Sequence, residues 1–462
     1  MHNTKTIQLN IKNYAKKGEA SSFFTSDLYL LILGLAAALA WSYNKPLYTY
    51  IFFALIIILI TFTQKTLTGT IPIILLSTFV FPDQQALLSQ QTIFSIVGLF
   101  LVFGLCAIFH IIKYKRKFKY PMSTIGFIAL FISAFFAGIT TPNHFGSAQW
   151  LLGVGTMGGL LISIFILSIA IGEYNPLFTA KCFVTLALLM IVQIFVYLLK
   201  QDNILSSISY KTMYLGWGIG NTAAQILAQS MPFVLYAMCK SKHFSMLFLL
   251  VFILSGVAII TTLSRAVMLS TALFAIPMIV YSLRLSVKPL LSTIYFIALS
   301  AGVFLLIFNL YNDEFKFVLN KLLSTGFSDH GRIRLWKLAI EVFKSHNKFF
   351  GAGYVYGSAL TLEGDYFITW YHNLFLEILA NMGLLGITAF LIHLIQKLYY
   401  TLKRHTKFAL SAFWSLCIMA LFGLLDITYF QPSFLIPMLI IYLVTQNGAK
   451  LKTPIPQDEL LV

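Results

Sequence analysis

The feature that most constrains this chain is a series of apolar segments near twenty residues long, which recur along almost its whole length. A helix of about twenty residues spans the hydrocarbon core of a bilayer. Of the 462 residues, 59% are hydrophobic and only 10% are charged, whereas a soluble chain carries about a quarter charged residues. The sequence therefore predicts an all-α, polytopic integral membrane protein.

We expect about fourteen transmembrane helices, within a range of about 12–14, because the first three and the last segments are short or have polar edges. The expected spans are Leu28–Trp41, Leu47–Phe62, Leu67–Phe81, Ile93–Ile112, Pro121–Thr140, Leu151–Ile171, Phe183–Leu199, Asn221–Cys239, Met246–Thr262, Ala266–Leu283, Leu290–Leu310, Asn373–Ile395, Phe408–Leu425 and Phe434–Thr445.

Lysine and arginine gather in alternate connections, which indicates the orientation of the chain. Basic residues follow the fourth, eighth, tenth and twelfth spans and also occupy the N-terminal segment. Cytoplasmic loops carry this excess, so we expect both termini in the cytoplasm. The net charge of +17 then reflects this orientation and contact with anionic membrane lipids. Nucleic acid is not an expected partner, because the chain has no soluble basic domain.

The expected organisation follows from one long polar loop. Residues 1–24 form a cytoplasmic N-terminal segment that does not resemble a cleavable signal peptide. Residues 25–310 contain transmembrane helices 1–11, residues 311–371 form an extracytoplasmic loop, residues 372–446 contain helices 12–14, and residues 447–462 form a cytoplasmic tail. The four cysteines lie in predicted spans or at their cytoplasmic ends, so we expect neither disulfides nor a thiolate metal site.

The long loop has local order of its own. Apolar residues recur at three-to-four spacing in Arg332–Ser345, and charged residues occupy the opposite face, which predicts an amphipathic helix. This helix should lie on the membrane surface or cap the bundle. It should stop before the turn that contains Gly351 and Gly353. A second external loop, 200–220, ends in the glycine-rich segment Leu215–Asn221, whose backbone could approach a ligand closely.

Ionisable residues at the external side are the candidate site. Arg265 lies at the rim between two spans, and an arginine at membrane depth usually has a partner or a function. Arg332 lies one helical turn before Trp336 and shares its face. Neutral imidazole is the usual general base near pH 7, and His372 faces the same compartment. The plain alternatives are an arginine that reaches lipid headgroups, a solvated loop charge and a structural histidine.

Two further polar residues follow His372 at the start of the twelfth span. They are Asn373 and, one turn later, Glu377. A carboxylate at this depth is expected to pair with a partner, such as one of the arginines.

The order of these motifs resembles the O-antigen ligase and polysaccharide polymerase family over about Gly216 to Leu391. Ser264-Arg265-Ala266 comes first, followed by Gly331-Arg332 and Trp336, then Gly351-x-Gly353, and finally His372-Asn373 with Glu377 and a downstream Gly-Leu-Leu-Gly. The chain departs from the family pattern at two points: Lys348-Phe349-Phe350 stands where a proline usually precedes Gly-x-Gly, and Arg334 is an extra basic residue beside the motif.

The resemblance implies a GT-C-like membrane glycosyltransferase of envelope biogenesis with a large extracytoplasmic loop. Members transfer a glycan from undecaprenyl diphosphate to a glycan or lipid A-core acceptor, with no cofactor and no required metal. Carried over by position, Arg265 and Arg332 would hold the diphosphate, with Arg334 as an alternative ligand, and His372 would act on the acceptor. Asn373, Glu377, Trp336, Gly351 and Gly353 would support the site.

Elementary chemistry is consistent with these implied roles. Guanidinium groups bind phosphate oxygens in a bidentate manner, and a sugar hydroxyl needs a base before it attacks. A single displacement would invert the anomeric carbon, whereas a double displacement would need a carboxylate nucleophile such as Glu377. The alternative class is a transporter or flippase for a lipid-linked or small anionic solute, with the same arginines as binding groups. The residues do not distinguish ligase from polymerase.

Overall fold

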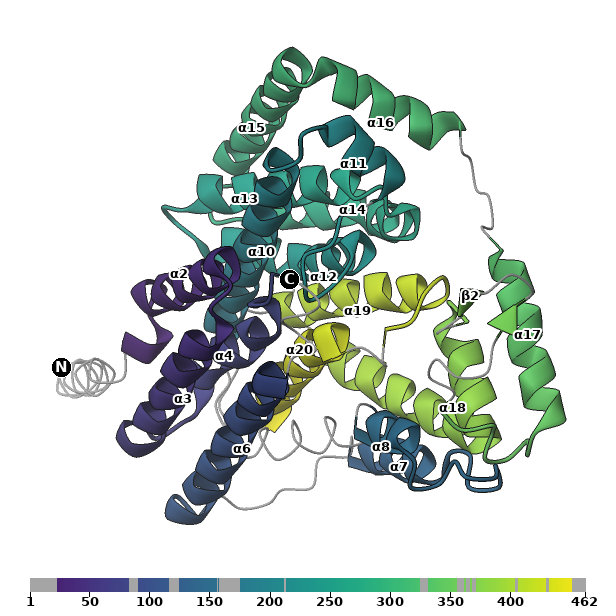
Figure 1. Cartoon of the computed structure of the whole chain (residues 1–462). Helices are drawn as coiled ribbons and strands as arrows, with labels where there is room; N and C mark the ends of the chain where they lie inside the picture. The colour runs from purple at the N-terminus through teal and green to yellow at the C-terminus, as the bar shows by residue number, and fades with distance from the viewer. Residues whose placement is uncertain are drawn as a thin grey trace.

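A computed structural model of the chain describes residues 23–82, 90–115, 124–155, 157, 175–211, 213–324, 331–354, 361–362, 366–367, 371–403, 406–428 and 432–450. Figure 1 shows these residues as a bundle of helices. The helices are α2 (Asp27–Tyr43), α3 (Pro46–Thr63), α4 (Ile71–Leu76), α6 (Gln90–Lys113), α7 (Thr124–Phe136), α8 (Ala148–Val154), α10 (Pro176–Leu199), α11 (Ile204–Tyr210), α12 (Gly220–Lys240), α13 (Ser245–Thr261), α14 (Arg265–Leu285), α15 (Pro289–Leu310), α16 (Asn312–Ser324), α17 (Arg332–Ser345), α18 (Leu374–Leu402), α19 (Lys407–Gly423) and α20 (Pro432–Lys450).

The helices confirm the all-α polytopic membrane fold. Six described helices are long and apolar enough to cross a membrane, and six shorter apolar helices lie at other predicted spans. The predicted span Leu151–Ile171 lies mostly outside the described residues. Short strands β1 (Thr361–Leu362) and β2 (Tyr366–Phe367) pair antiparallel within the long loop.

Helix α12 is the centre of the bundle. It packs against α10, α13, α14, α19 and α20, and almost all of its side chains are buried. It carries Gln225 and Gln229, which are fully buried, so it is less apolar than the helices around it. A polar helix is tolerated at this position because neighbouring helices shield it from lipid, as polar groups within membranes require.

The long loop contains more helix than the sequence predicted. The amphipathic helix at Arg332–Ser345 is present with the expected bounds, as α17. An additional helix, α16, begins directly after α15 and packs against both α15 and α11. Asp313 and Glu314 lie in its first turn and Lys321 in its last turn, where each charge is favourable for the helix dipole. Consequently α16 brings the first part of the loop back onto the bundle.

A break in α18 receives the glycine segment that follows α17. Gly383 has φ 64° and ψ −157° inside α18, which interrupts the helical hydrogen bonds. The chain around Gly351 and Gly353 fills this break: Ala352 N–H donates to the Ala380 carbonyl and Gly353 N–H donates to the Asn381 carbonyl. A Cβ atom on Gly351 would lie 2.6 Å from the Asn381 backbone. These glycines therefore allow backbone to approach backbone, and they anchor the end of α17 on α18.

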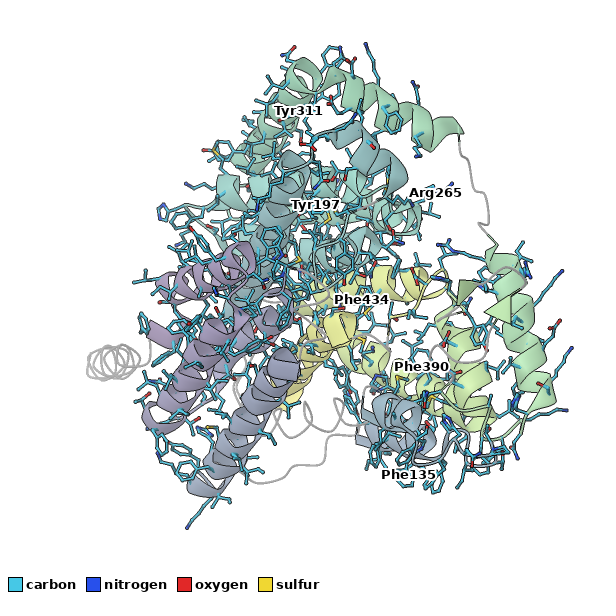
Figure 2. The ribbon with its side chains drawn as sticks, viewed as in Figure 1. Phe135, Tyr197, Arg265, Tyr311, Phe390 and Phe434 are labelled. Atoms are coloured by element: carbon cyan, nitrogen blue, oxygen red, sulfur yellow. The ribbon has the colours of Figure 1, made fainter. Side chains whose placement is uncertain are left out.

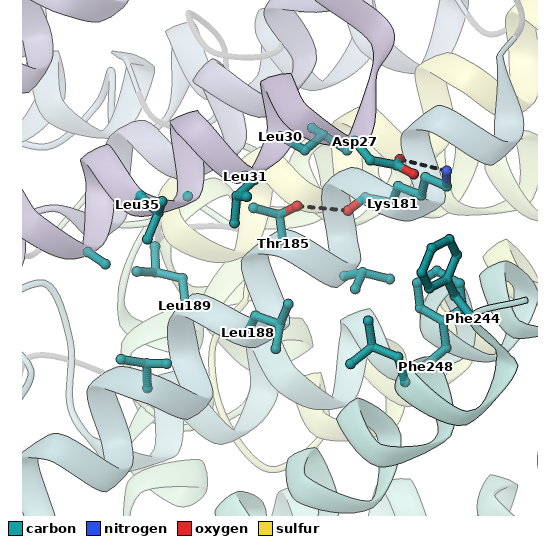
Figure 3. Close-up of a pocket in the computed structure, with 15 residues that line it drawn as sticks. Asp27, Leu30, Leu31, Leu35, Lys181, Thr185, Leu188, Leu189, Phe244 and Phe248 are labelled. Carbon is teal, nitrogen blue, oxygen red and sulfur yellow. Dashed lines mark hydrogen bonds and ion pairs between the residues drawn. The ribbon is translucent and has the colours of Figure 1, made fainter.

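An apolar groove lies at the other side of the bundle from α17. It has a volume of about 440 Å³ and is lined mainly by apolar residues of α2, α10 and α13 (Figure 3). Its polar end is the ion pair between Lys181 Nζ and Asp27 Oδ1, at 2.6 Å. Thr185 also lies in the groove, but its hydroxyl donates to the Lys181 carbonyl. The groove thus offers apolar surface for lipid chains and lacks a convergent set of polar groups.

Candidate active site

The centre of the site is a hydrogen bond between His372 and an acidic residue that the sequence reasoning missed. His372 Nδ1 lies 2.9 Å from Asp426 Oδ1. A carboxylate only accepts hydrogen bonds, so the imidazole donates from Nδ1 and its Nε2 carries a lone pair. His372 is partly exposed, with 42% of its side chain accessible, whereas Asp426 is 13% accessible. The imidazole therefore faces outward from a carboxylate that is largely shielded.

Asn373 explains why these two residues meet. Its side-chain oxygen accepts from the N–H groups of Phe375 and Leu376, which caps the start of α18. Its side-chain nitrogen donates to the carbonyl of Leu424 at 2.9 Å, just beyond the end of α19. One asparagine thus ties the beginning of α18 to the end of α19, and Asp426 follows two residues later. Asn373 was predicted to support the site, and it lies at this junction between α18 and α19.

A sequence signal for Asp426 existed. It is the acidic residue in the short connection between the last two predicted spans, Phe408–Leu425 and Phe434–Thr445. An acidic residue at the edge of a membrane span suggests a functional site by default. Nothing in the local pattern, however, shows that this connection lies beside His372, 54 residues earlier in the chain.

Helix α17 carries Trp336 and Arg332 and packs beside the start of α18, where His372 lies. Trp336 Nε1 donates to the carbonyl of His372, with 3.4 Å between the two atoms. Ala339, one turn later, is buried with Tyr371 and Ala380 where α17 packs on α18. Arg332 lies one turn before Trp336 and is half-buried, whereas Arg334 is exposed. The face of α17 that contacts α18 therefore carries Arg332, and Arg334 points to solvent.

Arg265 begins α14, on the same side of the bundle as α17 (Figure 2). An electrostatic effect connects it to Arg332. Burial, followed by the positive charges of Arg265, Arg332 and Lys321, lowers the pKa of Lys211. Both predicted arginines thus act on one lysine, which places them in a common cationic cluster.

Glu377 does not pair with an arginine among the described residues, contrary to the expectation from sequence. Its Oε2 accepts from the backbone N–H of Tyr371 at 2.9 Å, and its Oε1 accepts from the side-chain amide of Asn381 at 3.0 Å. Glu377 as a whole is 3% exposed. Burial and the Glu377 charge raise the pKa of the adjacent Tyr371 hydroxyl. Glu377 therefore holds the backbone at Tyr371, directly before His372, and is not open to a substrate.

Gly351 and Gly353 contact the backbone of α18 and not the imidazole of His372. They pack into the break of α18 near Asn381, which itself donates to Glu377. His144, in the connection between α7 and α8, accepts a hydrogen bond from Tyr354 N–H at its Nε2, at 3.0 Å. Burial lowers the pKa of His144, so this imidazole remains a neutral acceptor. The two glycines allow close backbone packing of this segment against α18.

The arrangement combines an outward-facing imidazole, oriented by a carboxylate, with a cluster of cations. The first group can remove a proton from a hydroxyl. The cations can bind several phosphate oxygens of one anion at the same time. Within the described part of the chain, no group of three or more histidine, cysteine or acidic side chains is placed to hold a metal ion.

Comparison with known protein families relates part of the chain to one of them. No curated protein matches the chain. The family model described as O-antigen ligase matches residues 250–391. This range includes Arg265, Arg332 and His372, together with α14–α17 and the first part of α18, whereas Asp426 lies beyond it. Residues 250–391 are therefore similar to the O-antigen ligase family, in agreement with the predicted resemblance to O-antigen ligases and polysaccharide polymerases.

Proposed function

We propose that the protein is a membrane glycosyltransferase that transfers or polymerises a glycan carried on undecaprenyl diphosphate, as an O-antigen ligase or a surface-polysaccharide polymerase. The observation that carries this proposal is the 2.9 Å hydrogen bond between His372 and Asp426. Helix α17, which carries the half-buried Arg332, is joined to His372 through Trp336. A general base oriented by a carboxylate can take part in making and breaking bonds. A transporter for an anionic solute would need only the cations that bind the solute. The family match supports glycan ligase or polymerase activity.

In the proposed reaction, His372 is the general base. Asp426 accepts the Nδ1 hydrogen and so keeps Nε2 available as the proton acceptor. As the acceptor hydroxyl attacks the anomeric carbon of the donor sugar, its proton moves to Nε2. A carbon–oxygen bond forms to the acceptor, and the bond from the anomeric carbon to the diphosphate oxygen breaks. The electron pair of that bond leaves with the diphosphate, and Asp426 stabilises the imidazolium that forms.

Arg265 and Arg332 hold the diphosphate in this scheme. Their guanidinium groups stay charged at every relevant pH and can bind phosphate oxygens in a bidentate manner. Charge builds up on the leaving diphosphate as its bond to the sugar breaks, and preorganised donors at that position lower the barrier. Arg332 is preferred over Arg334 because it is half-buried and belongs to the cationic cluster around Lys211, whereas Arg334 is exposed.

The geometry favours a single displacement with inversion. A double displacement needs a carboxylate that can attack the sugar. Both oxygens of Glu377 accept hydrogen bonds inside the protein. Asp426 Oδ1 accepts from His372 and also from the Ile427 N–H at 2.9 Å. Glu377 is therefore not free to attack the sugar, and Asp426 is engaged with the imidazole of His372. In the proposed reaction the acceptor hydroxyl is the nucleophile.

The remaining assignments follow from this reaction. The donor is an undecaprenyl-diphosphate-linked oligosaccharide, and the acceptor is a glycan or lipid A-core. The protein resides in a bacterial cytoplasmic membrane with both termini in the cytoplasm, so that α16, α17 and the start of α18 face outside. The reaction uses no metal and no cofactor, because the arginines carry the charge stabilisation that a metal would otherwise supply.

The decisive experiment uses purified protein in nanodiscs with a lipid-linked glycan. We expect transfer or elongation of the glycan that persists in EDTA. His372→Ala should lower the rate about 10²–10⁴-fold, whereas donor binding should remain. Movement of the lipid-linked glycan between leaflets without any new glycosidic bond would replace the proposal by the transporter alternative.

The glycan of a deletion strain separates the two enzyme activities. Loss of chain length would identify a polymerase. Loss of attachment, with long chains that remain on the lipid carrier, would identify a ligase.

A further inference from the structure

His372 has a backbone conformation that residues with a side chain rarely adopt. Its φ is 52°, in the left-handed region, and it lies directly before Asn373, which caps α18. A residue other than glycine is uncommon in this region, although histidine tolerates it better than most. Such a conformation persists only where the surrounding structure holds it. Contacts on both sides of His372 must therefore maintain it.

The contact on the N-terminal side comes from Glu377, in the first turn of α18. Its Oε2 accepts from the backbone N–H of Tyr371 at 2.9 Å. Its Oε1 accepts from the side-chain amide of Asn381 at 3.0 Å, so the carboxylate is itself held in place. Tyr371 is 3% exposed and packs where α17 meets α18. The residue before His372 is thus fixed at both its backbone and its side chain.

The contact on the C-terminal side comes from α17. Trp336 Nε1 donates to the carbonyl of His372, with 3.4 Å between the two atoms. The next residue, Asn373, is tied to the Leu424 carbonyl. Because the chain is held at both sides, the left-handed φ gives the Cα–Cβ bond of His372 one direction. In that direction Nδ1 lies 2.9 Å from Asp426 Oδ1.

We propose that Glu377 and Trp336 position the general base by acting through its backbone. Glu377 holds the N–H of Tyr371, so that His372 keeps the left-handed conformation that directs its imidazole to the neighbouring carboxylate. Trp336 holds the carbonyl of the same histidine. The inference rests on the proposed function. It gives Glu377 a part that needs an acceptor oxygen and neither a negative charge nor nucleophilicity, so an amide of the same shape should serve as well.

Two substitutions of Glu377 separate this role from a chemical one. Glu377→Gln keeps an oxygen for the N–H of Tyr371, and the amide of Asn381 can turn to accept from the new amide group, so transfer should stay near the wild-type rate. Glu377→Met has a similar length and no such acceptor. It should lower the rate at saturating donor about 10–100-fold, the effect of losing a charged hydrogen bond, while donor binding is unchanged. Glu341→Gln is the matched control, because Glu341 is an exposed carboxylate on α17.

Nitrogen NMR of the full-length protein in lipid vesicles, labelled with nitrogen-15 histidine, measures the orientation of the imidazole. The signal of His372 is identified by its loss in His372→Ala. At alkaline pH, where the ring is neutral, the hydrogen bond to Asp426 should keep the proton on Nδ1. Glu377→Gln should retain this tautomer, whereas Glu377→Met should shift it toward the Nε2–H form that imidazole favours in water. Trp336→Phe, at a partly exposed position, removes the other contact and should shift the tautomer in the same direction.

An unchanged tautomer in both Glu377→Met and Trp336→Phe would overturn the inference, and the Trp336→Phe result decides alone if Glu377→Met does not fold. Equal losses of transfer in Glu377→Gln and Glu377→Met would also overturn it, because the carboxylate would then take part in the chemistry. The proposed function is judged separately by glycan transfer of the wild type. If the tautomer changes as expected but the wild type transfers no glycan, the positioning role stands and the glycosyltransferase proposal fails.

Discussion

Replacement of Asp426 tests how the imidazole of His372 is oriented. Asp426 Oδ1 accepts from both the Nδ1 of His372 and the N–H of Ile427, each at 2.9 Å. In Asp426→Asn, an amide oxygen at the same point can keep both hydrogen bonds, so the imidazole retains its tautomer and loses only the negative charge beside it. In Asp426→Ala, the acceptor is lost entirely.

These two changes have different expected magnitudes. A hydrogen bond to a charged group contributes about 1.5–3 kcal/mol, and a neutral one contributes about 0.5–1.5 kcal/mol. Because a factor of ten in rate corresponds to about 1.4 kcal/mol, Asp426→Asn should slow transfer about tenfold. Asp426→Ala should slow it roughly 10–150-fold on the same scale. His372→Ala should slow it most, about 10²–10⁴-fold.

The assay is single-turnover glycan transfer in nanodiscs with saturating donor, with donor binding measured in parallel. Binding should stay near the wild-type value in all these variants, because the arginines hold the diphosphate. The double variant of His372 and Asp426 to alanine should be no slower than His372→Ala, since the two residues act as one unit. A fully active Asp426→Ala, or a further loss in the double variant, would refute the orienting role.

Three other predictions follow from the described geometry. Arg332→Lys should lower transfer roughly 10–100-fold because a point charge cannot replace a bidentate fork, while Arg334→Lys should remain near wild type in the same assay; the reverse result would exchange their roles. Cysteine at Ser345 should react with an impermeant maleimide in intact cells, whereas cysteine at Ser241 should not; the opposite pattern would reverse the orientation. The pKa of His144 is lowered from its ordinary 6.5, so the unfolded chain takes up protons more readily than the folded one as the pH falls. Stability that is present above about pH 6.5 should therefore decline toward the folded pKa, and His144→Gln, which can still accept from the backbone, should flatten this decline in thermal unfolding measurements across pH; an unchanged pH profile would contradict the argument.

The apolar segments and the amphipathic spacing of Arg332–Ser345 were enough to predict most of the helices. This succeeds because lipid forces each spanning segment to satisfy its own backbone hydrogen bonds as a helix, so the fold class is decided by local hydropathy. The same reasoning treated most of 311–371 as loop and overlooked α16. That helix is short and polar, and it gains stability by packing on α11 and α15, which hydropathy does not report.

The sequence by itself determined the fold class, the amphipathic helix and the candidate residues His372, Arg265 and Arg332. Only the tertiary structure brought Asp426 to His372, placed Arg332 on the packed face while Arg334 points to solvent, and gave Glu377 to Tyr371 and Asn381 in place of an arginine. The physical reason is that hydropathy and periodicity act over a few neighbouring residues. The contacts of the site instead depend on how α14, α17, α18 and the end of α19 pack, and that packing joins residues far apart in the chain.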